Sequence, residues 1–243
     1  MLGKIRLKLV EIIIAINEKL IFERRLKRFF IQSENAKIET VIDVGANRGQ
    51  TINFFFNLNK NVQIHSFEPN HKLFKFLLKR YQRNSKINIY NLGVSDKNGK
   101  KIFHENFLDL SSSFEELNHS STYLARKAQI LGVKPDEIIN RSYNVETTTL
   151  NDFIRKKNIS NIDLLKIDTE GHEHACLEGL FSKNINIPIK YIQLENHNDD
   201  MYANRIPFKR TISLLNKNSF FECIRIKHGF GKVEEVIFKY CNK

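Results

Sequence analysis

The chain has 243 residues, 41% of them hydrophobic and 27% charged, which is typical of a globular protein with a sizeable core. No run of 18 apolar residues occurs and no small-residue cleavage site follows the apolar N-terminal stretch, so we expect neither a spanning helix nor a secretory signal. The formal net charge of +12 is compatible with nucleic acid, an anionic membrane surface or an acidic saccharide as partner, and equally with a lysine-rich solvated surface.

The cysteines of the chain are few and widely spaced. Cys176, Cys223 and Cys241 match neither the pairing of a disulfide framework nor the ligand spacing of a zinc site. A reducing, cytoplasmic environment therefore fits best.

The N-terminal stretch carries apolar side chains at helical spacing. This pattern predicts one amphipathic helix over residues 2–31, in which eight basic side chains accompany three acidic ones. Such a helix can lie on an anionic membrane, but helices of this kind more often pack their apolar face on the domain or on a second subunit. We therefore separate a helical segment, residues 1–37, from a domain of residues 38–243. Peripheral membrane contact and a homodimer are possible roles of the segment.

From Thr40 onward, strands alternate with helices. The predicted strands are Thr40–Val44, Val62–Phe67, Ile87–Leu92, Ile162–Ile167 and Ile189–Leu194. The predicted helices are Gln50–Leu58, His71–Arg83, Leu150–Lys156 and one that ends near Phe181. This alternation predicts an α/β fold, a Rossmann-like parallel sheet with helices on both faces.

A long polar insertion interrupts the alternation. It covers residues 105–141 and contains a helical segment near Tyr123–Leu131. The short strands Lys101–His104 and Tyr143–Thr147 flank it. So long an insertion in a compact domain is either functional or mobile.

The last part of the chain predicts a hairpin. After a helix at Phe208–Asn216, strands at Phe220–Ile226 and Glu235–Tyr240 flank Gly229-Phe230-Gly231. Two strands joined by a short glycine turn predict an antiparallel pair at one edge of the sheet.

The turn after the first strand has the spacing Asp43-x-Gly45-x-Asn47-x-Gly49. Glycine accepts a positive φ and has no Cβ, so a ligand can approach the backbone closely. The spacing differs from the G-x-G-x-x-G of dinucleotide binders, which points to another nucleotide-like cofactor.

Acidic residues follow three of the strands, at Glu68, Asp168 and Glu195. Ligands of open α/β sheets bind beyond the carboxyl ends of the strands. Glu68 lies 25 positions after Asp43, close to the spacing of about 20 expected for a carboxylate that binds ribose hydroxyls. Pro69 follows at a helix start, so helix capping is the structural alternative. The glycine turn upstream favours the ribose interpretation.

The segment after the fourth strand is rich in acid and imidazole. Lys166 and Asp168 share one face of that strand, so we expect the buried lysine to pair with Asp168 or Asp43. The side chains here that could hold a hard cation are Asp168, Glu170, Glu195 and His197. We favour the alternative that they position substrate hydroxyls and that no metal binds.

Six short segments occur in an informative order. They are Val41–Gly49, Ser66-Phe67-Glu68-Pro69, Gly93-Val94-Ser95-Asp96, Ser111-Ser112-Ser113, Thr148-Thr149-Leu150 and Leu165–Glu173. In this order they resemble the FkbM-type S-adenosylmethionine-dependent methyltransferases, over roughly residues 38–200. The resemblance implies a seven-stranded methyltransferase sheet with an antiparallel strand near one edge. It also implies O-methylation, commonly of a sugar hydroxyl.

The resemblance further implies S-adenosyl-L-methionine as the cofactor. The residues that would surround its methionine part are Asp43, Gly45, Ala46, Asn47 and Gly49. Glu68, with Pro69 beside it, would hold the ribose, and Ser95 and Asp96 would lie by the adenine. Asp168 would approach the amino group of the cofactor or the acceptor.

Methyl transfer to a hydroxyl requires alignment of the acceptor oxygen and removal of its proton. Alignment contributes most, and a general base adds roughly 10²–10⁴-fold. The catalytic candidates are Asp168, Glu195 and His197. An unperturbed histidine suits proton removal near neutrality better than an exposed carboxylate does.

We therefore expect a cytoplasmic O-methyltransferase that acts on a sugar, a glycan precursor or another small hydroxyl acceptor. The alternative is a basic nucleic-acid-binding protein or RNA-modifying methyltransferase, which the net charge supports. We consider nucleic acid the weaker interpretation, because most of the 19 phenylalanines occupy core positions instead of base-stacking ones.

Overall fold

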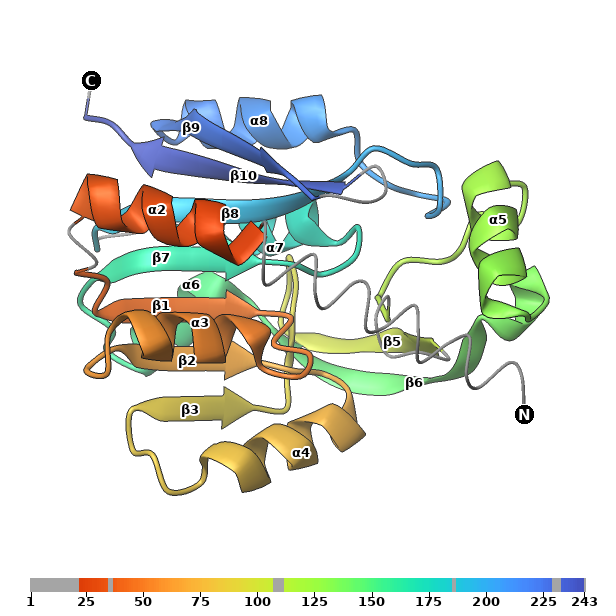
Figure 1. Ribbon diagram of the computed structural model, residues 1–243, viewed down its shortest axis with the longest axis horizontal. Helices are drawn as coiled ribbons and strands as arrows, with labels where there is room; N and C mark the ends of the chain where they lie inside the picture. Colours follow the sequence, from red (N-terminus) through yellow and green to blue (C-terminus); the bar gives the residue numbers. More distant parts are fainter. Residues whose placement is uncertain (1–21, 35–36, 107–111, 185–186, 229–232, 243) are drawn as a thin grey trace.

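A seven-stranded sheet forms the centre of the computed structural model, which describes residues 22–34, 37–106, 112–184, 187–228 and 233–242 (Figure 1). The strand order is β3-β2-β1-β7-β8-β10-β9. The strands are β1 (Thr40–Val44), β2 (Gln63–Phe67), β3 (Ile87–Tyr90), β7 (Ile162–Ile167), β8 (Ile189–His197), β9 (Phe220–Lys227) and β10 (Val233–Tyr240). All neighbours are parallel except at β10, which is antiparallel to both β8 and β9. The mostly parallel sheet and the C-terminal hairpin are therefore confirmed.

Helices cover both faces of this sheet because alternate strand residues point to opposite sides. Val41 belongs to the apolar cluster under one set of helices and Ile42 to the cluster under the other. The first set is α2 (Glu23–Glu34), α3 (Gln50–Leu58) and α4 (His71–Tyr81). The second set is α6 (Leu150–Lys156), α7 (Glu173–Phe181) and α8 (Phe208–Lys217).

The segment predicted as a polar, irregular insertion, residues 105–141, contains regular structure. A second sheet has the order β4-β6-β5. Its strands are β4 (Gly93–Val94), β5 (Gly99–Asn106) and β6 (Ile139–Thr148), and the segment between β5 and β6 contains α5 (Thr122–Leu131) and a short 3₁₀ turn, η2 (Pro135–Glu137). The polar residues at both ends of the predicted insertion, 105–106 and 139–141, thus belong to strands. Polarity did not reveal them because much of β6 is exposed to solvent.

Of the N-terminal segment, the structure describes α2. The larger part of the predicted helix over 2–31 lies outside the described residues, and α2 continues to Glu34. Leu26 and Phe30 are buried against the sheet, and Tyr191 on β8 donates a hydrogen bond of 2.6 Å to Glu34. The apolar face of α2 therefore packs on the domain and is not available to a membrane. No helix within the described ranges is long and apolar enough to cross a bilayer.

Candidate functional site

A cavity opens at the carboxyl ends of β1, β2, β7 and β8, where the sequence places its candidate residues. The candidates that line it are Gly45, Ala46, Asn47, Glu68, Pro69, Asp168 and Glu195. The candidates that do not line it are Asp43, Gly49, Ser95, Asp96 and His197. The sheet order places the glycine turn at one end of the cavity and the β8–β10 pair at the other.

The glycine turn is held against the neighbouring strand ends. The backbone N–H groups of Gly45 and Ala46 both donate to the carbonyl oxygen of Phe67, at 3.0 and 2.9 Å. Gly45 has a φ of 88°, and a Cβ placed on it would lie 1.8 Å from the carbonyl oxygen of Asp168. Glycine is required here because the loop after β7 approaches the turn after β1 so closely.

Glu68 bridges two loops and does not cap a helix. Its carboxylate accepts the backbone N–H of Asn47 at 2.7 Å and that of Asn70 at 2.8 Å. Asn70 itself caps α4, since its side chain accepts the N–H groups of Lys72 and Leu73. The capping alternative for Glu68 is therefore wrong, and the buried carboxylate fixes the glycine turn at the cavity wall.

Ser95 and Asp96 lie behind the cavity wall. The Ser95 hydroxyl is fully buried, donates to Asp96 at 2.8 Å and lies 2.9 Å from Nε2 of His172. The wall in front of them is apolar, and its side chains include Leu92, Val94, Phe103 and Phe114. This wall was not predicted from the sequence. The apolar residues directly before Ser95 were the signal from which it could have been found.

A buried lysine pairs with the carboxylate at the end of β7. Lys166 Nζ lies 2.7 Å from Asp168 Oδ2, as expected from the sequence. Burial opposes the charge of Lys166, yet the carboxylates of Asp168, Glu235 and Asp43 together raise its pKa. Burial raises the pKa of Asp43 to about 6, although Lys166 and a 3.1 Å hydrogen bond from Ser66 oppose this shift. The charge of the buried Lys166 on β7 is thus compensated by Asp168, the residue directly after this strand.

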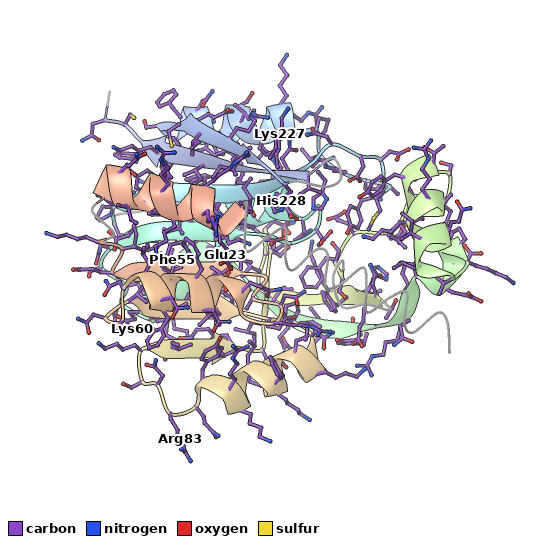
Figure 2. The ribbon with its side chains drawn as sticks, in the orientation of Figure 1. Glu23, Phe55, Lys60, Arg83, Lys227 and His228 are labelled. Atoms are coloured by element: carbon purple, nitrogen blue, oxygen red, sulfur yellow. The ribbon has the colours of Figure 1, made fainter. Side chains whose placement is uncertain are left out.

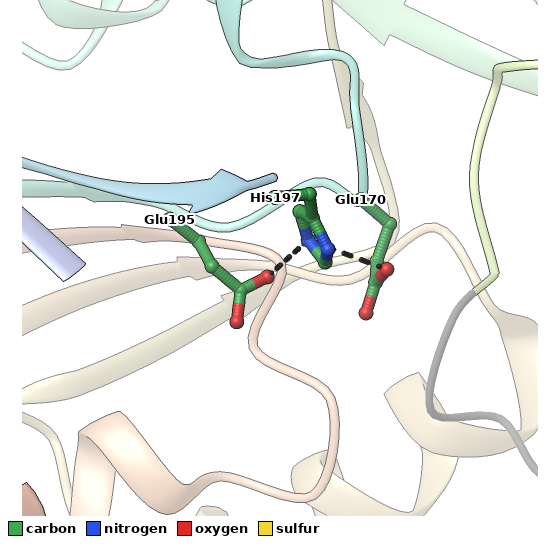
Figure 3. Close-up of side chains that lie close together, drawn as sticks. All are labelled: Glu170, Glu195 and His197. Atoms are coloured by element: carbon green, nitrogen blue, oxygen red, sulfur yellow. Dashed lines mark hydrogen bonds and ion pairs between the residues drawn. The ribbon is translucent and has the colours of Figure 1, made fainter. Parts of the chain in front are cut away.

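His197 lies between carboxylates (Figure 3). Its Nε2 is 2.6 Å from Glu195 and 3.5 Å from Glu170, and its Nδ1 is 3.7 Å from Asp199. Burial opposes a charge on the ring, but these carboxylates raise the pKa of His197 well above its ordinary value. The ring therefore does not have the ordinary pKa on which its choice as a base depended. Glu170 has a left-handed backbone, with a φ of 55°.

The far end of the cavity contains residues that no motif indicated. They are Phe22, Glu23, Gln193, His228 and Glu235. Glu23 begins α2 and His228 follows β9 (Figure 2). The Phe22 and His228 rings stack with their centroids 4.5 Å apart. These residues come together through the pairing of β10 with β8 and the packing of α2, neither of which has a local sequence signal.

Two overlapping sets of side chains have ligand atoms close enough for one metal ion. One set is Glu170, Glu195 and His197, and the other is Glu195, His228 and Glu235. In each set the ligand atoms lie within 4.8 Å of one another. Burial raises the pKa of Glu235 to about 7, although Lys166 opposes this shift.

Comparison with known proteins identifies the family of the chain. A family model for the methyltransferase FkbM domain matches residues 43–223. The 2-O-methyltransferase NoeI of Sinorhizobium fredii (strain NBRC 101917 / NGR234) is 25% identical over 183 residues, which are 72% of this chain and 70% of NoeI.

Solved structures share the fold at low identity. Magnesium protoporphyrin IX methyltransferase (ChlM) from Synechocystis PCC 6803, with bound SAM, has a TM-score of 0.50 at 9% identity, over 90% of this chain and 78% of that one. A putative rRNA-methylase from Clostridium thermocellum has the same TM-score and identity, over 90% of this chain and 95% of that one. The family match covers most of the chain, and the chain belongs to the FkbM family of S-adenosylmethionine-dependent methyltransferases.

Proposed function

We propose that the protein transfers a methyl group from S-adenosylmethionine to a hydroxyl group of a sugar or glycan precursor. The observation that carries this proposal is the polar end of the cavity, where Asp168, Gln193, Glu195 and Glu235 present hydrogen-bonding side chains. Such a surface suits an acceptor with several hydroxyl groups. The name of the relative NoeI, a 2-O-methyltransferase, supports transfer to oxygen.

The other end of the cavity fits the cofactor. Glu68, buried at the end of β2, would bind the ribose hydroxyls, and the turn from Gly45 to Asn47 would lie along the methionine part. The apolar side chains of Leu92 and Val94 would cover the adenine, in front of the buried Ser95. When bound, the cofactor supplies an electrophilic methyl group with a neutral thioether as leaving group.

Asp168 is the candidate that best fits direct contact with the acceptor. Its side chain is 28% exposed, against 12% for Glu195 and 10% for His197. Lys166 fixes one carboxylate oxygen of Asp168 at 2.7 Å. Asp168 would orient the acceptor hydroxyl and receive its proton. His197 would act as a positioning residue, because it contacts Glu195 and does not line the cavity.

The charge of the cavity disfavours a polyanionic acceptor. The carboxylates that line it are Glu23, Glu68, Asp168, Glu170, Glu195 and Glu235, whereas Lys166 is the one lysine among the described lining residues. Lys166 is already paired with Asp168. A nucleic acid would bring phosphates towards a cavity lining in which carboxylates outnumber cationic side chains, despite the net charge of +12 of the chain. A neutral acceptor avoids this repulsion.

The proposal includes a cytoplasmic location, which the absence of paired cysteine spacings supports. Peripheral membrane contact remains a prediction for the part of residues 2–31 that precedes α2. Flotation of the full chain with anionic liposomes tests it, and protein that stays at the bottom of the gradient contradicts it.

Two measurements test the proposed function. Calorimetry should give micromolar binding of S-adenosylmethionine, and a radiolabelled methyl group should appear on one or more of a panel of free, nucleotide-linked and lipid-linked sugars. Total RNA, included as a second acceptor, should stay unlabelled. Labelled RNA with unlabelled sugars would refute the acceptor class, and absent cofactor binding would refute the reaction.

A further inference from the structure

Two carboxylates face each other across the β8–β10 ladder. Glu195 on β8 and Glu235 on β10 are direct register partners, and both are largely buried. Like charges directly opposite each other destabilise an antiparallel pair, and burial adds a desolvation cost. The nearby Lys166 is bonded to Asp168 at 2.7 Å, and His197 is bonded to Oε2 of Glu195. Lys166 and His197 therefore do not fully compensate the charges of Glu195 and Glu235.

A histidine completes a metal-ligand arrangement with this pair. The ligand atoms of Glu195, His228 and Glu235 lie within 4.8 Å of one another, and His228 Nε2 is 3.9 Å from Glu235 Oε1. The stacked ring of Phe22 restricts the orientation of the imidazole. Three ligands, from β8, from β10 and from the residue directly after β9, thus converge on one point of the cavity.

Two buried atoms at the same place have no hydrogen-bond partner in the part of the chain that the structure describes. They are Oε1 of Gln193 and Nε2 of His228. Gln193 is fully buried, lines the cavity and donates its Nε2 to Glu235 at 3.1 Å, so its amide lies against the carboxylate pair. A buried acceptor without a partner costs about 1–3 kcal/mol. A cation can use both of these atoms as electron-pair donors.

We propose that Glu195, Glu235 and His228 bind a divalent cation, Mn²⁺ or Mg²⁺, with Gln193 as an adjacent oxygen donor. Two carboxylates and an amide oxygen suit these hard cations, and the single imidazole makes Mn²⁺ the better probe. This proposal replaces the expectation that no metal binds. It also differs from the ligand set that the sequence indicated, which shares only Glu195 with it: Asp168, Glu170 and His197 are replaced by Gln193, His228 and Glu235.

The role of the cation rests on the proposed function. A bound cation lowers the pKa of a hydroxyl that contacts it, which matters because a carboxylate is a weak base for an alcohol proton. The acceptor oxygen then forms a bond to the methyl carbon, and the carbon–sulfur bond breaks with its electron pair passing to sulfur. The hydroxyl proton passes to Asp168. Two neighbouring sugar hydroxyls could contact the cation together, which would favour a vicinal diol as acceptor.

Titration with Mn²⁺ tests the site without any acceptor. The full chain is treated with EDTA, exchanged into metal-free buffer and titrated while electron paramagnetic resonance measures free Mn²⁺. We expect one bound ion per chain, and Glu235→Gln should weaken binding by at least about tenfold. Glu222→Gln removes an exposed carboxylate of the same hairpin and should leave binding unchanged. His228→Gln is the second ligand variant if circular dichroism shows that Glu235→Gln is unfolded.

The outcomes separate this proposal from the proposed function. No Mn²⁺ binding at millimolar concentration, or equal binding by the wild type and both ligand variants, would overturn the cation site. Calorimetry with S-adenosylmethionine in EDTA should still show binding, because the ligands lie at the other end of the cavity. If Mn²⁺ binds but no sugar is methylated, the result would support the cation site and refute a sugar as the acceptor.

Discussion

Replacement of Glu68 by glutamine tests the junction between the glycine turn and the end of β2. The two carboxylate oxygens accept the N–H groups of Asn47 and Asn70 at 2.7 and 2.8 Å. An amide has only one oxygen, so in Glu68→Gln one buried N–H would face an NH₂ group. A hydrogen bond to a charged group contributes about 1.5–3 kcal/mol, and we expect a loss of about 2 kcal/mol in the free energy of unfolding.

The same substitution should weaken the cofactor. If the ribose hydroxyls bind to Glu68, a loss of about 2 kcal/mol corresponds to an increase of about 30-fold in the Kd for S-adenosylmethionine. Urea denaturation measures the first effect and calorimetry the second. Glu146→Gln, which removes an exposed carboxylate on β6, is the control and should change neither. A variant with lower stability but unchanged Kd would show that Glu68 only holds the loops together and would refute its role in ribose binding.

Three further substitutions probe other parts of the structure. Gly45→Ala should lower the free energy of unfolding by about 3 kcal/mol in urea, because its Cβ would collide with the Asp168 carbonyl and its φ is positive; a loss below about 1 kcal/mol would contradict this packing. Burial lowers the pKa of His65 to about 4, so the unfolded chain binds the proton more tightly and stability is lost as the pH falls below about 6.5. Between pH 7 and 5 this loss should be about 2 kcal/mol, and His65→Gln should remove it in urea titrations at both pH values; an equal pH dependence in both proteins would refute the assignment. His197→Gln should lower kcat by about 10²-fold with unchanged cofactor affinity, because Glu195 loses its positioning partner. Steady-state kinetics measures kcat and calorimetry the cofactor affinity, and an unchanged kcat would disprove the positioning role.

The core of the fold was predictable because its signals are local. Strands such as Ile162–Ile167 are short apolar runs between turns, and the structure places β7 at the predicted residues. The glycine spacing predicts the turn from Asp43 to Gly49. Glycine readily adopts positive φ angles, and the structure shows them at Gly45 and Gly49. Hydrophobic periodicity and turn residues were therefore sufficient to predict the sheet and the end of the cavity that the glycine turn forms.

The other end of the cavity could not be predicted because it depends on long-range pairing. Glu235 is opposite Glu195 only because β10 inserts between β8 and β9. Nothing near Phe22 or His228 in the sequence indicates that they stack on each other. The prediction for Ser95 failed in a different way. The residue follows a strand, so its side chain was expected to contact the cofactor, but its hydroxyl donates a hydrogen bond to Asp96 behind the apolar wall of the cavity. Sequence position identified the loop, while the direction of the side chain required the packed structure.

The position of β10 has a consequence for the order in which the protein folds. β8 pairs with β10, and β9 is joined to the sheet through β10, so the hairpin must add to the edge of β8 as one unit. Pairing of segments far apart in sequence is the slow part of folding. The register of β8 with β10 joins Glu195 to Glu235, 40 positions apart, whereas that of β1 with β7 joins Asp43 to Lys166, 123 positions apart. We therefore expect the strands at the acceptor end of the cavity to pair before β1 meets β7 and brings the glycine turn against Asp168.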